Sequence, residues 1–137
     1  MSTKDLILVS ACLAGLTTRY DGRVLSYPAC SEELKRYQWI PVCPEQLGGL
    51  PTPRCPANIV GGDGADVLDG KARVICTDGT DVTEAFIHGA RQVLKIAQRQ
   101  PVQKVFLKGR SPSCGIANSG VTAALLIRNG FDVSEFG

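Results

Sequence analysis

Three cysteines of this chain occur at the same kind of place, just after a predicted buried strand. They are Cys12, Cys43 and Cys114. The apolar runs that precede them are Leu6–Val9, Trp39–Val42 and Val102–Leu107. Because the loops at the carboxyl ends of parallel strands form one crevice, we expect the three thiols to converge in space.

Converging thiols indicate a metal centre. Three thiolates in one cleft repel one another unless a cation neutralises them, and coordination deprotonates a thiol. Ligation by thiolates alone suits an iron–sulfur cluster or zinc. Three ligands would leave one iron of a four-iron cluster open, or one position of a zinc ion, and either metal would then be a Lewis acid. The alternative is that each cysteine packs as a small buried hydrophobe.

Prolines and glycines shape the loops around these three cysteines, which favours the metal interpretation for them. The other cysteines, Cys30, Cys55 and Cys76, do not follow the pattern. We predict that the Cys76 side chain packs at the end of a strand. Cys55, in the segment Thr52-Pro-Arg-Cys-Pro56, stays a candidate for a hidden fourth ligand.

Candidate catalytic groups lie close to these cysteines in the sequence. Glu45 follows Cys43 by two residues, and a carboxylate beside a metal can move protons to or from a water molecule. It could equally be an ordinary carboxylate at the start of a helix. Ser111 and Ser113 flank Pro112, where they could donate hydrogen bonds to a ligand or simply close a turn.

Basic residues gather on the same predicted loops. They are Arg19, Arg54, Lys108 and Arg110. An anionic cluster or a substrate phosphate would explain their placement. Solvated surface charge is the alternative explanation.

Strands alternate with helices along the chain, which predicts one α/β domain over residues 1–137 with a mostly parallel sheet. The predicted helices are Ser31–Tyr37 with Ser31 as N-cap, a long amphipathic helix from Asp81 to Arg99 with Glu84 completing a capping box, and Gly120–Arg128 capped by Asn118 or Ser119. Two further strands are expected at Lys71–Cys76 and at Phe131–Val133, the latter at an edge. The segment 45–70 is rich in Gly and Pro, so we expect it to be mostly loop.

Composition excludes several classes of protein. The net charge of +2 over 137 residues is too small to indicate DNA binding or an extended tRNA interface. No run of about 18 apolar residues and no secretory signal is present, so we expect a cytoplasmic protein without a membrane partner. In that reducing compartment the cysteines are not expected to form a disulfide framework.

Several segments together resemble a known family, the thiouracil desulfidases. They are VSACLAG with RYDG, PVCPEQLGGLPTPR, DGTDVTEAFIHGA, LKGRSPSCG and GVTAALL, in this order. The resemblance runs from about Leu6 to the C-terminus. It implies a Rossmann-like three-layer fold and removal of sulfur from thiolated uracil bases or nucleotides without net redox.

The resemblance also implies the roles of individual residues. A 4Fe-4S cluster with one open iron would be held by Cys12, Cys43 and Cys114. Glu45 and Ser111 match the family's catalytic carboxylate and serine. Apart from the resemblance, their places on the predicted loops make Ser113, Arg19, Asp21, Lys108 and Arg110 the expected substrate-binding residues. Two other interpretations remain: a non-catalytic metal or iron–sulfur module, and a metal-free enzyme with a cysteine nucleophile.

Overall fold

A parallel four-stranded sheet forms the centre of the computed structural model, which describes residues 4–109, 111–112, 115 and 120–137. Its strands are β1 (Leu6–Ser10), β2 (Gln38–Val42), β5 (Val102–Lys108) and β6 (Val133–Phe136). They lie in the order β2-β1-β5-β6, and every neighbouring pair is parallel. The predicted α/β class with a mostly parallel sheet is confirmed. The expected edge strand is β6, which begins two residues later than predicted.

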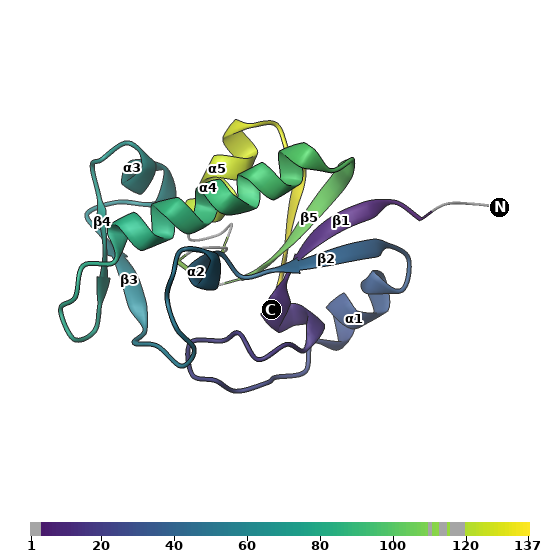
Figure 1. Cartoon of the computed structure of the whole chain (residues 1–137), viewed down its shortest axis with the longest axis horizontal. Helices are drawn as coiled ribbons and strands as arrows, with labels where there is room; N and C mark the ends of the chain where they lie inside the picture. The colour runs from purple at the N-terminus through teal and green to yellow at the C-terminus, as the bar shows by residue number, and fades with distance from the viewer. Residues whose placement is uncertain (1–3, 110, 113–114, 116–119) are drawn as a thin grey trace.

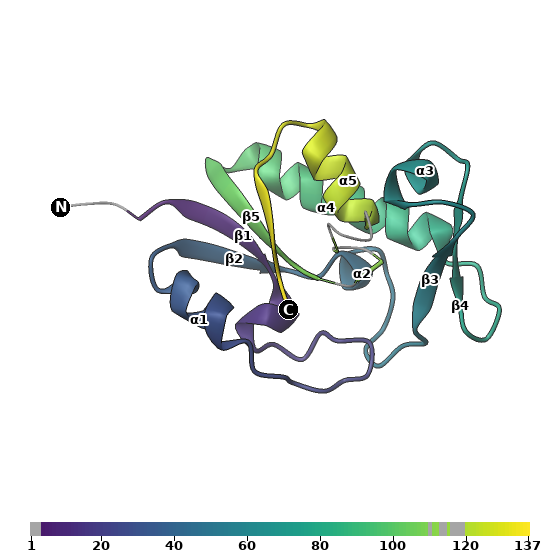
Figure 2. The same ribbon diagram turned by 180° about the vertical axis from the view of Figure 1, so that it is seen from behind.

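Helices cover both faces of this sheet (Figures 1 and 2). They are α1 (Pro28–Leu34), α4 (Thr83–Arg99) and α5 (Val121–Arg128). Neighbouring side chains of a strand point to opposite faces. Leu8 therefore packs in one core cluster with Val93 and Leu126 of α4 and α5. Ile7 packs in another cluster with Leu34 of α1. The continuous apolar run of β1 thus becomes the centre of a three-layer fold.

A small antiparallel ribbon stands beside the main sheet, against the amino-terminal half of α4 (Figure 1). It consists of β3 (Ala57–Val60) and β4 (Arg73–Cys76), joined through α3 (Gly64–Leu68). Val74 of the ribbon and Phe86 of α4 are buried in one shared core cluster. The sequence predicted the second strand of this pair but not the first.

The segment 45–70 is more ordered than predicted, because it contains α2 (Pro44–Leu47), β3 and α3. Asp63, within this expected loop, is the N-cap of α3. The Asp63 carboxylate accepts a hydrogen bond from the Asp66 N–H, and the Asp66 carboxylate accepts one from the Asp63 N–H, both at 3.0 Å. This reciprocal capping box satisfies two donors that the helix end would otherwise leave unpaired.

Two predicted helix starts are wrong. The first helix begins at Pro28 with Tyr27 as its N-cap. Proline suits the first helical position, because the N–H that it lacks would have no hydrogen-bond partner within the helix. The long helix begins at Thr83 without the capping box expected at Asp81. The Asp81 carboxylate accepts the Thr83 N–H at 2.9 Å and pairs with Arg73 on β4.

The last helix begins at Val121 with Gly120 as its N-cap. The predicted caps Asn118 and Ser119 lie outside the described residues. The predicted end of this helix at Arg128 is confirmed, and Gly130 follows it with a φ of +83°, a conformation that suits glycine.

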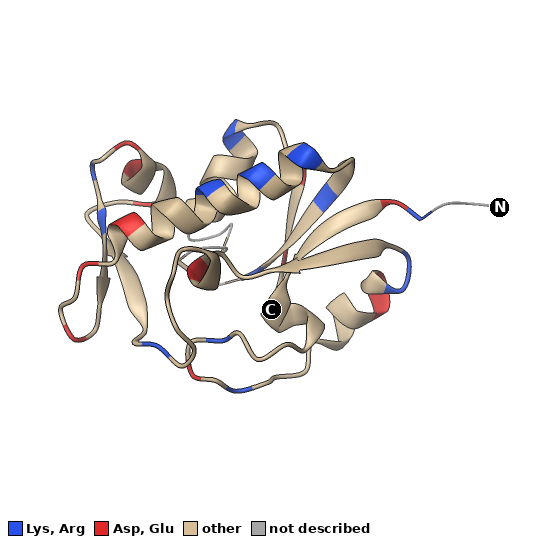
Figure 3. Cartoon of the chain, viewed as in Figure 1, with Lys and Arg blue, Asp and Glu red and all other residues tan. Residues whose placement is uncertain are grey.

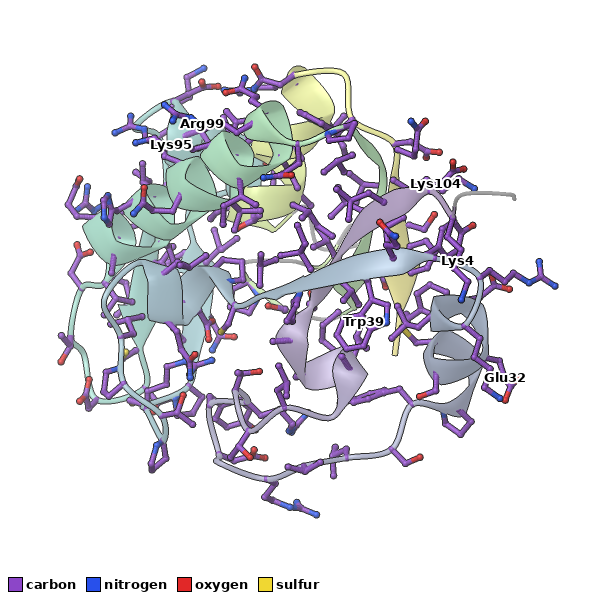
Figure 4. All side chains as sticks on the ribbon, turned by 45° about the vertical axis from the view of Figure 1, so that its right-hand side comes forward. Lys4, Glu32, Trp39, Lys95, Arg99 and Lys104 are labelled. Atoms are coloured by element: carbon purple, nitrogen blue, oxygen red, sulfur yellow. The ribbon has the colours of Figure 1, made fainter. Side chains whose placement is uncertain are left out.

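Charged residues mark the outward faces of the helices. Figure 3 shows Lys and Arg along α4, and Figure 4 shows Lys95 and Arg99 extending from the same helix away from the sheet. The opposite side of α4 is buried, as the amphipathic pattern predicted. No helix in the described part of the chain has the length and apolarity needed to cross a membrane.

Candidate functional site

A cavity of about 550 Å³ opens at the carboxyl ends of β1, β2 and β5 and extends to the β3–β4 ribbon. This edge includes the topological switch point of the sheet. The chain passes from β1 to β2 on one side of β1 and then crosses to β5 on the other side. Such edges are where open α/β sheets bind ligands. Of the predicted site residues, those lining the cavity are Cys12, Arg19, Cys43, Glu45, Lys108 and Ser111.

Cys12 and Cys43 reach the cavity from two neighbouring strands. Cys12 lies in a short 3-10 helix (Ala11–Ala14) that directly follows β1. The hydroxyl of Ser10, at the end of β1, accepts a hydrogen bond of 2.9 Å from the Lys108 N–H and so joins the ends of β1 and β5. Cys43 is the N-cap of α2, with Pro44 at the first helical position. Cys114, the third predicted ligand, lies outside the described residues.

Burial raises the pKa of both Cys12 and Cys43. Burial raises the pKa of Cys12 above its ordinary value, and the neighbouring Cys43 raises it further. Burial also raises the pKa of Cys43, although its own backbone surroundings and Arg54 oppose the shift. Both groups are therefore protonated at neutral pH unless a cation binds between them. This pair suits a thiophilic metal centre better than a metal-free thiolate nucleophile.

Glu45 is held by a buried arginine. The Glu45 carboxylate lies in the first turn of α2 and forms an ion pair with Arg54. Arg54 also donates hydrogen bonds to the Thr18 carbonyl and to the Thr52 hydroxyl, each at 2.8 Å. Only 7% of the Arg54 side chain and 14% of the Glu45 side chain are exposed to solvent. The sequence indicated Arg54 only as a loop cation, because nothing along the chain shows that it pairs with Glu45.

Close glycine contacts fix α2, which carries Glu45, against α4. A Cβ atom added to Gly48 would overlap the carbonyl group of Ala85, and one added to Gly89 would overlap that of Pro44. The two helices can therefore approach this closely only with glycine at both positions. Local sequence patterns do not reveal this pair of glycines, because the contact joins two separate helices.

Arg19 and Asp21, both predicted to bind substrate, pair with each other. The Arg19 guanidinium donates to the Asp21 carboxylate at 2.9 and 3.1 Å, and to the Tyr27 hydroxyl at 3.2 Å. Hydrogen bonding to Arg19 lowers the pKa of Asp21 to about 2. Arg19 lines the cavity, whereas Asp21 is not among its lining residues. The structure thus gives Asp21 the position of a residue that orients Arg19.

The remaining predicted residues divide into two groups. Lys108 lies at the cavity, where its ammonium donates to the carbonyls of Gly109 and Gly137 at 2.7 and 3.0 Å. Ser111 also lines the cavity. Arg110 and Ser113 lie outside the described residues.

One cavity residue that the sequence did not indicate as a ligand-binding group is Thr18. Its hydroxyl is buried and, among the described residues, lacks a hydrogen-bond partner. Its carbonyl accepts hydrogen bonds from Arg54 and, more weakly, from the Cys43 thiol. A buried hydroxyl beside a cavity is free to bond a polar ligand.

A second group of metal-ligand type lies on the ribbon. The sulfurs of Cys55 and Cys76 and a carboxylate oxygen of Asp78 all lie within 4.8 Å of one another. All three residues line the same cavity. Cys76 does end a strand, as predicted, but it faces Cys55 rather than only packing. No sequence signal could have found this group, because it depends on the pairing of β3 with β4.

Together, the fold and the cavity define an α/β protein with a cysteine-lined site at the carboxyl edge of a parallel sheet. The model of the 2-thiouracil desulfurase family matches residues 7–135. The chain belongs to this family and is a desulfidase enzyme.

Two relatives support this assignment. The uncharacterised protein YbbK of Bacillus subtilis (strain 168) is 42% identical to this chain, and the match covers 93% of each chain. Among solved structures, the [4Fe-4S]-dependent thiouracil desulfidase TudS superposes with a TM-score of 0.80 at 35% identity. That match covers 96% of this chain and 91% of TudS. The predicted resemblance to the thiouracil desulfidases is thereby confirmed.

Proposed function

We propose that this enzyme hydrolyses the carbon–sulfur bond of a thiolated uracil base or nucleotide, releasing the uracil compound and sulfide, with a 4Fe-4S cluster as cofactor. Family membership and the similarity to TudS support this proposal. The structural observation that carries it is the convergence of Cys12 and Cys43 on one cavity beside the Glu45–Arg54 pair.

The donor set of the cavity fits the cluster. Burial raises the pKa values of the Cys12 and Cys43 thiols, so a bound cation would be needed to ionise them at neutral pH. Cys114 is the proposed third ligand. When bound, a cluster with one iron free of protein ligands supplies a Lewis acid that attracts the thiocarbonyl sulfur.

Glu45 is the proposed general base. Its carboxylate would take a proton from a water molecule whose oxygen attacks the thiocarbonyl carbon. The carbon–sulfur bond then breaks, the sulfur leaves as hydrosulfide, and the uracil ring keeps the new oxygen. The oxygen of the water takes the place of the sulfur, one water proton leaves with the hydrosulfide, and Glu45 releases the other to solvent, so no electrons are gained or lost. Arg54 would orient the carboxylate during this exchange, because it holds Glu45 while anchored on the Thr18 carbonyl.

The other polar residues of the cavity would bind the substrate. Ser111 and Thr18 are proposed to bond the polar edge of the pyrimidine, together with Ser113. Arg19 and Lys108 would attract a substrate phosphate, assisted by Arg110, with Asp21 orienting Arg19. A cavity of about 550 Å³ is of a size that takes a small molecule such as a mononucleotide. We therefore propose a free base or nucleotide as substrate rather than tRNA or DNA. A reducing cytoplasm would keep the thiols available.

The test combines metal analysis with turnover. Anaerobically reconstituted protein should be brown and contain about four irons and four sulfides per chain. It should release sulfide from a small panel of thiolated uracil bases, nucleosides and nucleotides. Colourless protein with stoichiometric zinc would contradict the cluster.

Substitution of Glu45 separates catalysis from cofactor binding. Glu45→Gln should keep its iron and sulfide yet lose roughly 100-fold or more in turnover, as expected for removal of a general base. The matched control is Glu84→Gln, which lies on the first turn of α4. Full turnover in Glu45→Gln with an intact cluster would exclude Glu45 from the mechanism and favour a module that only binds the cluster.

A further inference from the structure

The β3–β4 ribbon brings three ligand-type side chains together outside the proposed cluster site. Cys55 precedes β3, Cys76 is the last residue of β4, and Asp78 lies in the turn that follows. Antiparallel pairing places Ala57 opposite Cys76, which brings Cys55 beside it. The two sulfurs and a carboxylate oxygen of Asp78 lie within 4.8 Å of one another.

This spacing suits a single ion. Around a tetrahedral zinc, with zinc–sulfur bonds near 2.3 Å and zinc–oxygen bonds near 2.1 Å, neighbouring ligand atoms lie roughly 3.6 to 3.8 Å apart. Small side-chain rotations would therefore bring the three atoms onto one ion. Two thiolates and one carboxylate favour zinc over magnesium or calcium, which prefer oxygen ligands.

The backbone around the three side chains is held in place by hydrogen bonds. Thr77, between two of the ligands, donates its N–H to the Pro56 carbonyl at 2.9 Å and so ties the ends of the two strands together. Its hydroxyl lies 3.0 Å from the Cys55 sulfur. The Asp78 carboxylate accepts the Thr80 N–H at 2.9 Å, which fixes the turn. Such outer contacts orient the ligands of metal sites.

We propose that Cys55, Cys76 and Asp78 form a second, mononuclear site that binds zinc or a similar thiophilic divalent cation at the ribbon wall of the cavity. The site shares no ligand with the proposed cluster and adds to the proposed function rather than replacing it. Three protein ligands leave a fourth position for water or for another small donor. Binding releases the thiol protons to solvent and involves no electron transfer.

The test uses reduced, cluster-loaded protein and Zn²⁺ as the probe, with a chromogenic chelator as competitor. One Zn²⁺ per chain should bind while the iron content stays unchanged. Cys55→Ser and Cys76→Ser should each weaken binding by at least roughly 100-fold, and Asp78→Asn by roughly 10-fold or more, because loss of a direct ligand should cost at least as much as loss of an outer contact. Cys30→Ala and Asp69→Asn, which do not line the cavity, are the matched controls and should bind as the wild type does.

X-ray absorption at the zinc edge identifies the ligands without interference from iron. Two sulfur neighbours per zinc, with oxygen completing the shell, are expected. The proposal would be overturned if the wild type bound less than one Zn²⁺ per chain, or if both cysteine variants bound Zn²⁺ as tightly as the wild type. Three sulfur neighbours around the zinc would also overturn it. Loss of iron from Cys55→Ser would also overturn it, by making Cys55 a cluster ligand.

The second site can fail or succeed independently of the proposed function. Should the wild type hold no iron, the same zinc measurement on a Cys12→Ser/Cys43→Ser variant isolates the ribbon site. Binding there would support the second site although the cluster had failed. Conversely, a cluster-loaded protein that binds no zinc would refute the second site alone.

Discussion

Arg54 connects three segments of the cavity wall. Its guanidinium pairs with Glu45 on α2, donates to the Thr18 carbonyl after β1, and lies 3.9 Å from the Cys43 sulfur. The planar guanidinium presents five N–H donors in a fixed geometry, whereas an ammonium group presents three donors at the end of a flexible chain. Charge alone therefore does not explain why an arginine occupies this position.

Arg54→Lys should lower the turnover number more than it raises KM. The lysine keeps the charge but loses the geometry that holds the Glu45 carboxylate, and misplacement of a catalytic group by about 1 Å can cost roughly 100-fold. Steady-state kinetics on protein of measured iron content would test this. Arg73→Lys, in an exposed ion pair with Asp81, is the control and should be unaffected. Unchanged kinetics in Arg54→Lys would show that the carboxylate needs no positioning by a guanidinium.

At the scale of elements, the contact of α2 with α4 decides where Cys43 and Glu45 lie. Gly48 and Gly89 allow backbone to meet backbone across this contact. An alanine at either position would meet a carbonyl group rather than a flexible side chain, so the helices would have to separate.

Gly89→Ala gives opposite expectations from helix propensity and from packing. Propensity alone would stabilise the helix by about 1 kcal/mol. The overlap with the Pro44 carbonyl should cost about 1 to 3 kcal/mol or more, so we expect a lower free energy of unfolding. Urea unfolding would measure it, with Gln98→Ala on the exposed face of α4 as the control. An increase in stability for Gly89→Ala would refute the close contact.

Asp81 makes the junction of β4 and α4 sensitive to acid. Hydrogen bonds from Thr83, with a smaller effect of Arg73, lower the pKa of Asp81 to about 2. A carboxylate with a depressed pKa stabilises the fold above its unfolded pKa near 3.9, and this contribution is lost as the pH falls toward 2.

Asp81→Asn should therefore be less stable than the wild type at pH 7, and the difference should shrink between pH 4 and pH 2. Urea midpoints of both proteins across this range would show the convergence. Asp5→Asn, at an exposed position before β1, is the control. A difference that stays constant down to pH 2 would rule out the ionised carboxylate as its source.

At the scale of the whole molecule, the proposed cluster would join loops that follow three different strands. A ligand that binds only the folded state raises stability by mass action. Reconstituted protein should thus unfold at a higher temperature than the same protein stripped of iron under reducing conditions. Calorimetry on the wild type and on Cys12→Ser would test this, because the variant should show little difference between the two preparations. Equal melting temperatures for wild-type protein with and without iron would indicate that the cluster does not join the loops.

The amino-acid sequence by itself determined the fold class, the strand-end placement of Cys12 and Cys43, and the proximity of Glu45 to them. These features follow from local patterns: a doubly buried strand is a continuous apolar run, and whatever comes next stands at its carboxyl end. The resemblance to the thiouracil desulfidases predicted the desulfidase activity, which the family model and the TudS structure then supported.

Only the tertiary structure decided the Arg54–Glu45 pair, the contact of Gly48 and Gly89 with the facing helix, and the group of Cys55, Cys76 and Asp78. Each of these depends on which backbone segments pack together in space. The starts of α1 and α4 differ from the predicted ones for a related reason. Side chains that can cap a helix end also accept hydrogen bonds in turns and ion pairs, and the tertiary structure decides which of these contacts forms.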